Sequence, residues 1–351
     1  MKILMLVNWK VKYTEEIPDD LQAPDYYTKK EKYWFFRYFP ENTEVDVIDI
    51  SSNKLMEKIE RKYLHFYIIQ TIKAIKIMKN YDVVISHGMP SGILLSLYRR
   101  IFGKKKEKHI IFDIGAFNSA KENGIILKLN QFASKSIDGI IYHESEQIEY
   151  YKKCFPWLIE KSKFIPFGTD IVYFDRDMEK EGNVEDYILS IGYSLRDNET
   201  LIDAYRKSNI KYKLKIIGAT DKYKEENNIQ FYPPIKKREL NRQIQNARFC
   251  ILPLEYKNFS FGQMTLLQQM YYGKAVITAN VPSVKDYVQD KKTAIIYESK
   301  NVEDLKNKIE LLENEEIVKE IGANARQAVI NNFNEKNMSN NIFKFIKEIF
   351  S

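Results

Sequence analysis

The chain has 351 residues, of which 44% are hydrophobic and 29% are charged, so it is long enough for two domains with separate cores. This composition excludes a disordered or fibrous protein, and no apolar run approaches the roughly 20 residues of a membrane-spanning helix. The net charge of +7 is unevenly placed, because residues 52–138 hold 16 Lys and Arg against 7 Asp and Glu. Cys154 and Cys250 fit no zinc or redox spacing, so we expect reduced thiols in a cytoplasmic protein without a metal site.

Short runs rich in Val and Ile alternate with helical patterns in the first half of the chain. We predict strands at residues 3–7, 45–48, 83–85, 109–112 and 139–142. Helical periodicity covers residues 55–78, 92–101 and 145–153. Strands buried on both faces and separated by helices indicate a parallel sheet, so residues 1–166 are predicted to form one doubly wound α/β domain.

Polar residues follow several of these strands, at the sheet edge where α/β domains bind ligands. Asn8 and Trp9 follow the first strand, and a long loop rich in charged and aromatic residues continues to about Tyr33. A loop of this length in a compact domain is usually functional, so it is a candidate for shaping a binding site. Later strand ends carry single acids or histidines, namely His87, Asp113, His143 and Glu144. A purely structural role for any single His stays open.

The densest basic cluster comprises Arg99, Arg100 and the segment Lys104–Lys108. One interpretation is a solvated face of the domain. The other is attraction to an anionic membrane surface or to a pyrophosphate-bearing lipid. Nucleic acid is the weaker candidate, because no nucleic-acid-binding motif accompanies the charge.

The second half repeats the alternation of strands and helices. Strands are predicted at residues 187–191, 213–217, 249–252, 275–278 and 294–297, and helices at 200–208, 237–246, 302–312 and 315–331. Pro166 and Gly168 indicate a hinge between the halves, so a second domain is expected over residues 171–334. A final amphipathic helix at 335–351 is expected to cross back onto the first domain.

The stretch 260–278 carries the clearest chemical signal. It is predicted to form a small polar loop with Gly262, a short helix that ends at Gly273, and a buried strand. Unpaired N–H groups at the positive end of such a helix bind phosphate. Arg196 stands before another predicted helix, where a guanidinium is suited to holding a diphosphate.

This stretch resembles the donor-binding signature of the retaining GT-B-fold glycosyltransferases of family 4 (glycosyl transferases group 1). That signature has two Glu residues separated by seven others, and they align here with Ser260 and Gln268. The segment 165–170, with Phe174 after it, is similar to the family's Ile-Pro-Asn-Gly-Val-Asp segment. The resemblance implies two facing doubly wound domains of GT-B architecture and a donor that is a UDP- or GDP-sugar. It assigns donor binding to Gly192, Arg196, Gly218, Tyr232, Ile235, Gly262, Gln263, Thr265, Leu266 and Gln268.

The resemblance also suggests roles in catalysis and acceptor binding. It implies catalytic roles for Asp113, His87, Arg196 and Ser260, and we expect the acceptor near Asn8, Trp9, His143 and Glu144. The expected acceptor is lipid-linked or a polysaccharide in cell-envelope glycan synthesis, with no metal or cofactor besides the nucleotide sugar. The expected location is cytoplasmic, with peripheral contact at the inner face of the membrane through the basic cluster.

Two alternatives stay open. A nucleotide-sugar 2-epimerase shares this fold and needs acid–base carboxylates. A non-catalytic, nucleotide-sugar-binding partner subunit would explain why Ser260 and Gln268 replace both carboxylates of the signature.

Overall fold

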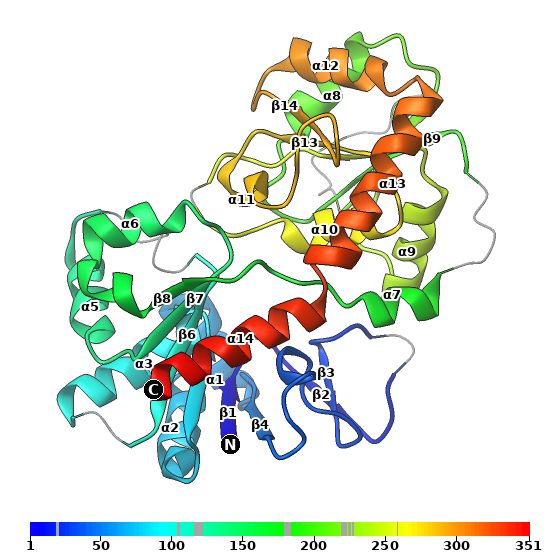
Figure 1. Ribbon diagram of the computed structural model, residues 1–351. Helices are drawn as coiled ribbons and strands as arrows, with labels where there is room; N and C mark the ends of the chain where they lie inside the picture. Colours follow the sequence, from blue (N-terminus) through cyan, green and yellow to red (C-terminus); the bar gives the residue numbers. More distant parts are fainter. Residues whose placement is uncertain are drawn as a thin grey trace. The chain divides into compact units, whose positions relative to one another are not determined.

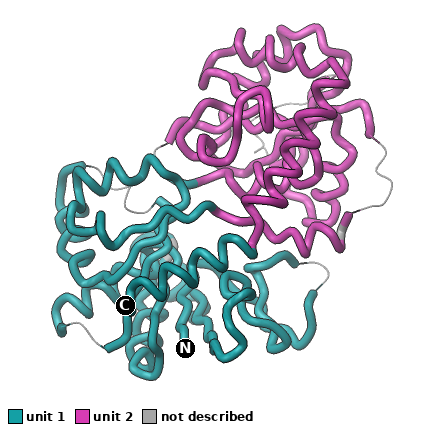
Figure 2. The backbone as a smooth tube through the Cα atoms, in the orientation of Figure 1, with its two compact units in different colours: residues 1–166, 258–260, 336–351 teal, residues 167–257, 261–335 magenta. Residues whose placement is uncertain are grey.

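The computed structural model describes residues 1–18, 21–103, 106–115, 122–178, 184–218, 223, 226, 228–257 and 259–351. These residues form two compact units, coloured separately in Figure 2. The first unit comprises residues 1–166, 258–260 and 336–351, and the second comprises residues 167–257 and 261–335. Along the described stretches, none of the helices combines the length and apolar content that crossing a bilayer requires.

The first unit is built on a six-stranded parallel sheet with the order β4-β1-β5-β6-β7-β8. Its strands are β1 (Lys2–Leu6), β4 (Glu44–Ile48), β5 (Val83–His87), β6 (Lys108–Asp113), β7 (Gly139–Tyr142) and β8 (Ser162–Phe164). Ile3 of β1 lies between Val45 of β4 and Val83 of β5, and all three side chains are buried. Only β8, at the sheet edge, was not predicted from the apolar runs, because it is short and polar.

The helices of the first unit are α1 (Lys54–Ile59), α2 (Ile68–Ile77), α3 (Met89–Ile101), α5 (Ile125–Ser134) and α6 (Gln147–Cys154). The continuous helix predicted over residues 55–78 is wrong. After α1 the chain forms a π-helical turn, η2 (Glu60–Leu64), and reverses at His65, whose φ of 57° is left-handed. The buried Glu60 carboxylate then accepts a hydrogen bond of 2.9 Å from the N–H of Ile69 and so stabilises the start of α2.

The long loop after β1 contains its own small structure. Strands β2 (Lys12–Thr14) and β3 (Tyr26–Thr28) pair in parallel, and a 3₁₀ turn, η1 (Trp34–Phe36), follows them. Trp34, Phe35 and Phe36 are buried, so the aromatic run is part of the core. Two further 3₁₀ turns lie at η3 (Met78–Asn80) and η4 (Pro156–Lys161).

Helix α14 (Glu335–Phe350) belongs mostly to the first unit, as Figures 1 and 2 show. The rings of Phe343 and Phe39 meet edge to face at 5.0 Å. Gly139, at the start of β7, allows the close approach of the helix, because a Cβ there would lie 2.5 Å from the side chain of Ile349. The far end of the chain therefore completes the core around the first sheet.

The second unit contains another six-stranded parallel sheet, with the order β11-β10-β9-β12-β13-β14. Its strands are β9 (Tyr187–Ile191), β10 (Lys213–Ile217), β11 (Ile229–Tyr232), β12 (Cys250–Leu252), β13 (Val276–Ala279) and β14 (Ile295–Tyr297). Its helices are α7 (Ile171–Asp177), α8 (Asn198–Lys207), α9 (Lys237–Asn246), α10 (Gln263–Tyr271), α11 (Pro282–Lys285), α12 (Val302–Leu311) and α13 (Glu315–Asn332). The strand order turns in opposite directions on either side of the β9–β12 pair, which makes this the topological switch point of the sheet.

The segment around Gly168 is paired with the segment that follows α13. Thr169 N–H bonds to the carbonyl of Phe333 at 2.8 Å, and Glu335 N–H bonds to the carbonyl of Thr169 at 3.0 Å. A Cβ at Gly168 would lie 2.3 Å from the carbonyl oxygen of Asn334, so the close pairing requires glycine. The two stretches at which the chain passes between the units therefore lie side by side.

Candidate functional site

The loop after β9 contains Arg196, whose side chain folds back against the main chain of the same loop. Gly192 follows the strand with a φ of +154°, and its N–H bonds to the carbonyl of Ile217 at 3.0 Å. A Cβ at Gly192 would lie only 2.2 Å from Nε of Arg196. Glycine is therefore the residue that lets this guanidinium lie against the end of the strand.

Three hydrogen bonds fix the direction of the Arg196 side chain. Its Nε donates to the carbonyl of Ile191 at 3.0 Å and its Nη1 to that of Ser194 at 3.1 Å, while Nη2 lies 3.5 Å from Oγ1 of Thr265. Burial lowers the pKa of Arg196 to about 10, which still leaves it a cation at neutral pH. Among the residues that the structure describes, no carboxylate forms an ion pair with it. A half-buried cation without a counter-ion favours an anionic ligand.

Thr265 lies in the first turn of α10, which begins with open N–H groups. Gly262 is the N-cap, with a φ of +81°, and no side chain caps the helix. The first intrahelical bond runs from the N–H of Leu266 to the carbonyl of Gly262 at 3.0 Å. The N–H groups of Gln263, Met264 and Thr265 have no acceptor within the described part of the chain. They lie at the positive end of the helix dipole.

The Arg196 guanidinium and the start of α10 therefore form one electropositive site at the switch point of the second sheet. The backbone joins their loops, because Asp197 N–H bonds to the carbonyl of Pro253 at 2.7 Å and Glu255 N–H bonds to that of Leu195 at 3.2 Å. Phosphate oxygens match both a planar guanidinium and a row of helix N–H groups. This arrangement, which we call the diphosphate site, is suited to holding a nucleoside diphosphate.

The ends of the neighbouring strands β10 and β11 lie next to the diphosphate site, and a second glycine, Gly218, connects them by a hydrogen bond. Gly218 follows β10 with a φ of +90° and bonds through its N–H to the carbonyl of Tyr232 at 2.8 Å. The ring of Tyr193 lies over Gly218, because a Cβ there would be 2.4 Å from the ring. Tyr193 is exposed and was not among the predicted site residues, although its position directly after Gly192 could have indicated it. Ile235 is half-buried against the core of the unit.

The remaining predicted donor residues have other contacts. The side chain of Leu266 is fully buried and its N–H is used inside the helix, so it supports the site from the core. The buried amide of Gln263 donates to the carbonyl of Ser283 at 2.8 Å, which leaves only its main-chain N–H for a ligand. Gln268 donates to Oδ1 of Asn241 at 2.5 Å. Asn241 is a buried amide on the apolar face of α9, a signal that the sequence pattern offered and the prediction missed. Ser260 precedes α10 and is half-buried.

In the first unit, three predicted residues meet at the switch point between β1 and β5. The rings of Trp9 and His87 pack edge to face at 4.6 Å, and Trp9 Nε1 donates to the carbonyl of Pro24 at 3.2 Å. The amide nitrogen of Asn8 lies 3.6 Å from the Cβ position of Gly88. Burial, together with the charge of nearby His143, lowers the pKa of His87 to about 3. His87 is therefore a neutral imidazole, and its Nδ1 is buried without a partner among the described residues.

Asp113 is the most enclosed of the predicted catalytic residues. Its carboxylate is fully buried and accepts hydrogen bonds from Gly115 N–H at 2.9 Å and the Tyr151 hydroxyl at 2.5 Å. The Gln147 amide nitrogen lies 3.5 Å from Oδ2 of the same carboxylate. Gln147 and Tyr151 stand four residues apart on α6, and the prediction missed both. Their bonds to Asp113 favour a role in ordering this strand end over direct acid–base chemistry.

His143 and Glu144 follow the neighbouring strand β7. His143 Nδ1 lies 2.7 Å from the carbonyl of Ile165, and burial lowers the pKa of His143 to about 4. Both side chains are buried, His143 almost completely and Glu144 fully. The structure thus groups the predicted residues of the first unit at one sheet edge, but it encloses most of them.

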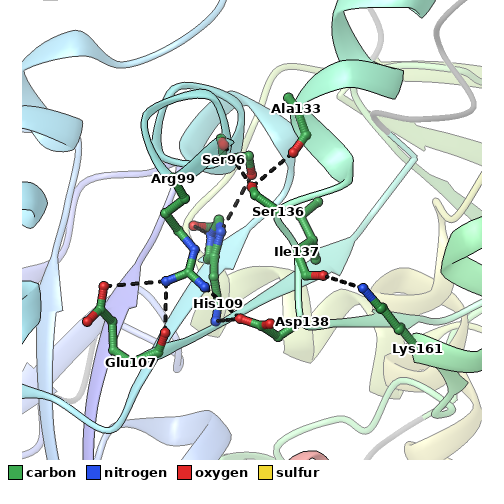
Figure 3. A network of polar contacts seen from close by, with 10 residues as sticks. Ser96, Arg99, Glu107, His109, Ala133, Ser136, Ile137, Asp138 and Lys161 are labelled. Atoms are coloured by element: carbon green, nitrogen blue, oxygen red, sulfur yellow. Dashed lines mark hydrogen bonds and ion pairs between the residues drawn. The ribbon is translucent and has the colours of Figure 1, made fainter. Parts of the chain in front are cut away.

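The basic cluster needs a correction, because Arg99 is internal. Its side chain is only 1% exposed, and its guanidinium lies 2.6 Å from Asp138 and 3.4 Å from Glu107 (Figure 3). The same network includes His109, whose main-chain N–H donates to the Asp138 carboxylate at 3.0 Å. Arg99 therefore cannot contact a membrane in this fold. Arg100 and Lys106 are exposed, whereas Lys104 and Lys105 lie outside the described residues.

Within the described ranges, no group of three or more His, Cys, Asp or Glu side chains is placed to hold a metal ion. Both cysteines are buried free thiols.

Comparisons with known proteins agree with this fold. No curated protein sequence matches the chain, but residues 177–328 match the sequence model of the family described as glycosyl transferases group 1. Sucrose-phosphate synthase from Thermosynechococcus elongatus superposes with a TM-score of 0.69 at 16% identity, over 100% of this chain and 99% of that chain. A glycosyltransferase from Rickettsia africae gives the same four values, 0.69, 16%, 100% and 99%.

The HepE protein of Anabaena, solved in complex with UDP, has a TM-score of 0.69 at 14% identity and covers 99% of this chain and 100% of its own. HepE has also been solved in complex with UDP-glucose. The prediction of two doubly wound parallel sheets is confirmed. The chain has the two-sheet fold of the GT-B glycosyltransferases, and its residues 177–328 carry the sequence pattern of glycosyl transferases group 1.

Proposed function

We propose that the protein is a retaining, family 4 glycosyltransferase that moves a sugar from a UDP- or GDP-sugar to a lipid-linked or polysaccharide acceptor in cell-envelope glycan synthesis. The observation that carries the proposal is the diphosphate site. There Arg196, a cation without a counter-ion in the described chain, lies beside the open N–H groups of α10. This site falls within the residues that match glycosyl transferases group 1, and the UDP and UDP-glucose complexes of HepE support the choice of donor.

The chemistry follows from the charge that the leaving group acquires. Breaking the bond between the sugar and the diphosphate places negative charge on the terminal phosphate oxygens. Fixed donors aimed at that charge stabilise the transition state more than the substrate, and they need no reorganisation. The Arg196 guanidinium and the N–H groups of Gln263, Met264 and Thr265 supply these donors. The strand end around Gly218, Tyr232 and Ile235 is then available for the nucleoside.

A second candidate is a partner subunit that binds nucleotide sugar without turnover. The observation that favours it is the chemistry at the two signature positions. Gln268 carries a neutral amide that already donates to Asn241, and Ser260 has no charge. A 2-epimerase has less support, because Asp113 is buried and engaged by hydrogen bonds.

The diphosphate assignment is tested by calorimetric titration of the full chain with UDP, GDP, uridine and guanosine. Replacing Arg196 with Ala removes a charge-assisted contact, so the affinity for the preferred diphosphate should fall roughly 10- to 100-fold. The affinity for the matching nucleoside should not change. The control is Arg206→Ala, which removes an exposed arginine that pairs with Asp203 and Glu226 near the end of α8.

Equal losses for diphosphate and nucleoside would place Arg196 elsewhere and refute the diphosphate site. Turnover is then measured as release of UDP or GDP from candidate nucleotide sugars, with and without lipid-linked acceptors. Acceptor-dependent release supports the transferase. Tight binding without release from any donor supports the partner subunit instead.

A further inference from the structure

Helix α5 turns an apolar stripe outward from the first unit. Ile125, Leu129 and Phe132 follow one another at spacings of four and three residues, so they share one side of the helix. Their exposed fractions are 84%, 45% and 46%, and Ile126 beside them is 65% exposed. The opposite side is buried through Leu127, Asn130, Ala133 and Ser134. The helix is thus held in the unit by one face, and among the described residues its second apolar face stays exposed.

The end of α3 extends this stripe. Ile101 and Phe102 are 63% and 65% exposed, and α3 packs directly against α5. The guanidinium of Arg100 lies 5.3 Å from the ring centroid of Phe132, which joins the two helices at the surface. We call the six side chains Ile101, Phe102, Ile125, Ile126, Leu129 and Phe132 the α3/α5 patch. Exposed apolar side chains gathered on two packed helices in this way are uncommon on monomeric proteins and mark interaction surfaces.

Positive charge borders the α3/α5 patch. Lys128 and Lys135 are seven residues apart, so both lie along one border of the stripe, and both are exposed. Arg100 and Lys106 add exposed positive charge from α3 and the loop after it. The acid just before α5, Glu122, is ion-paired with Lys153 and so adds no net negative charge. The border is therefore net cationic.

We propose that the α3/α5 patch is a membrane-docking surface that seats the first unit on an anionic phospholipid bilayer. Apolar side chains on a convex helix, bordered by Lys and Arg, match a bilayer surface, where acyl chains lie beneath phosphate headgroups. The surface rests on the first unit alone and is independent of the diphosphate site. It keeps the exposed Arg100 and Lys106 of the basic cluster, leaves out Arg99, which the fold buries, and adds Lys128 and Lys135 of the α5 region.

The test is flotation of the full chain with vesicles of phosphatidylcholine alone and of phosphatidylcholine with phosphatidylglycerol, at low and high salt. The chain should float with the anionic vesicles, and less at high salt. Replacing both Ile125 and Leu129 with Ser should weaken binding by at least about tenfold, because two inserted side chains are lost. The matched control is Leu55→Ser, since Leu55 of α1 is 68% exposed and outside the patch. Lys128→Gln with Lys135→Gln should remove most of the preference for anionic vesicles.

Fluorescence of the tryptophans and UDP titration verify that each variant is folded, so a lost bilayer contact is distinguishable from a lost donor site. The proposal is overturned if the wild type ignores anionic vesicles or if the double serine variant binds them as well as the wild type does. Equal binding to neutral vesicles also contradicts the cationic border. Sedimentation that shows a dimer, dissolved by the double serine variant while vesicle binding is unchanged, assigns the patch to a second copy of the chain instead.

Discussion

Three buried histidines predict that the first unit loses stability in mild acid. Burial lowers the pKa of His87 and His109 to about 3 and that of His143 to about 4, from an ordinary value of 6.5. Below pH 6.5 the unfolded chain therefore binds more protons at these sites than the folded chain does. Stability falls as the pH drops from 6.5 towards the folded pKa values.

The magnitude follows from the displacement of each pKa. At pH 5, an imidazole with an ordinary pKa in the unfolded chain and a pKa of 3 to 4 in the fold costs about 2 kcal/mol of stability. Three such groups together cost about 6 kcal/mol, which is comparable to the whole stability of many domains. Partial unfolding of the first unit near pH 5 is therefore expected.

The assay is urea unfolding at pH 7.5 and pH 5.0, followed by tryptophan fluorescence. All three tryptophans, Trp9, Trp34 and Trp157, lie in the first unit, so the signal reports this unit alone. Other titrating groups also contribute to the total, so a variant isolates one histidine. His109→Gln keeps a polar group between Ser86 and Ser96, and it should reduce the difference between the two pH values by about 2 kcal/mol.

Imidazole resonances provide an independent check by nuclear magnetic resonance. The signals of His87, His109 and His143 should not titrate above pH 5 in the folded protein. Midpoints near 6.5 for these three residues, or an unchanged pH dependence in His109→Gln, would refute the reasoning.

Two further predictions concern stability and the diphosphate site. Arg99→Met should destabilise the first unit by about 3 to 5 kcal/mol in urea unfolding at pH 7.5, because Glu107 and Asp138 lose their buried partner; a loss under about 1 kcal/mol would mean that the ion pairs contribute little. Gly262→Ala should destabilise the second unit in thermal unfolding and weaken UDP binding. The backbone at this position has a φ of +81°, which strains alanine, and the added methyl group would lie 2.9 Å from the side chain of Leu254. Gly103→Ala is the control, since Gly103 has a φ of +80° but an added methyl group there would meet no atom within 4 Å. Equal losses of stability in both variants would assign the effect to the backbone conformation alone.

Most strands of the two sheets and the start of α10 were predictable because their signals are local. A strand buried on both faces is apolar at most of its positions, as β5 and β9 are, and an N-cap with positive φ selects glycine at Gly262. The position of Arg196 just before α8 was predictable for the same reason, whereas its role in binding a diphosphate stays a prediction.

Other features depend on contacts distant in sequence. The break at His65 depends on Glu60 capping the next helix, and residue spacing does not record that contact. From the sequence, Arg99 looks like a surface charge, because its ion-pair partner Asp138 is distant in sequence and is brought close only by the fold. The outward face of α5 has the residue types of a buried face, so only the structure shows that nothing in the described chain covers Ile125.

The composition of the first unit also constrains the order in which the protein can fold during synthesis. Residues 336–351 belong to it, although the whole second unit is translated between them and Pro166. The ribosome therefore releases a complete second unit before the first can close over Phe39 and Gly139. Until then the first sheet has an unfinished apolar side, which makes the nascent first half the stage at which chaperone protection matters most.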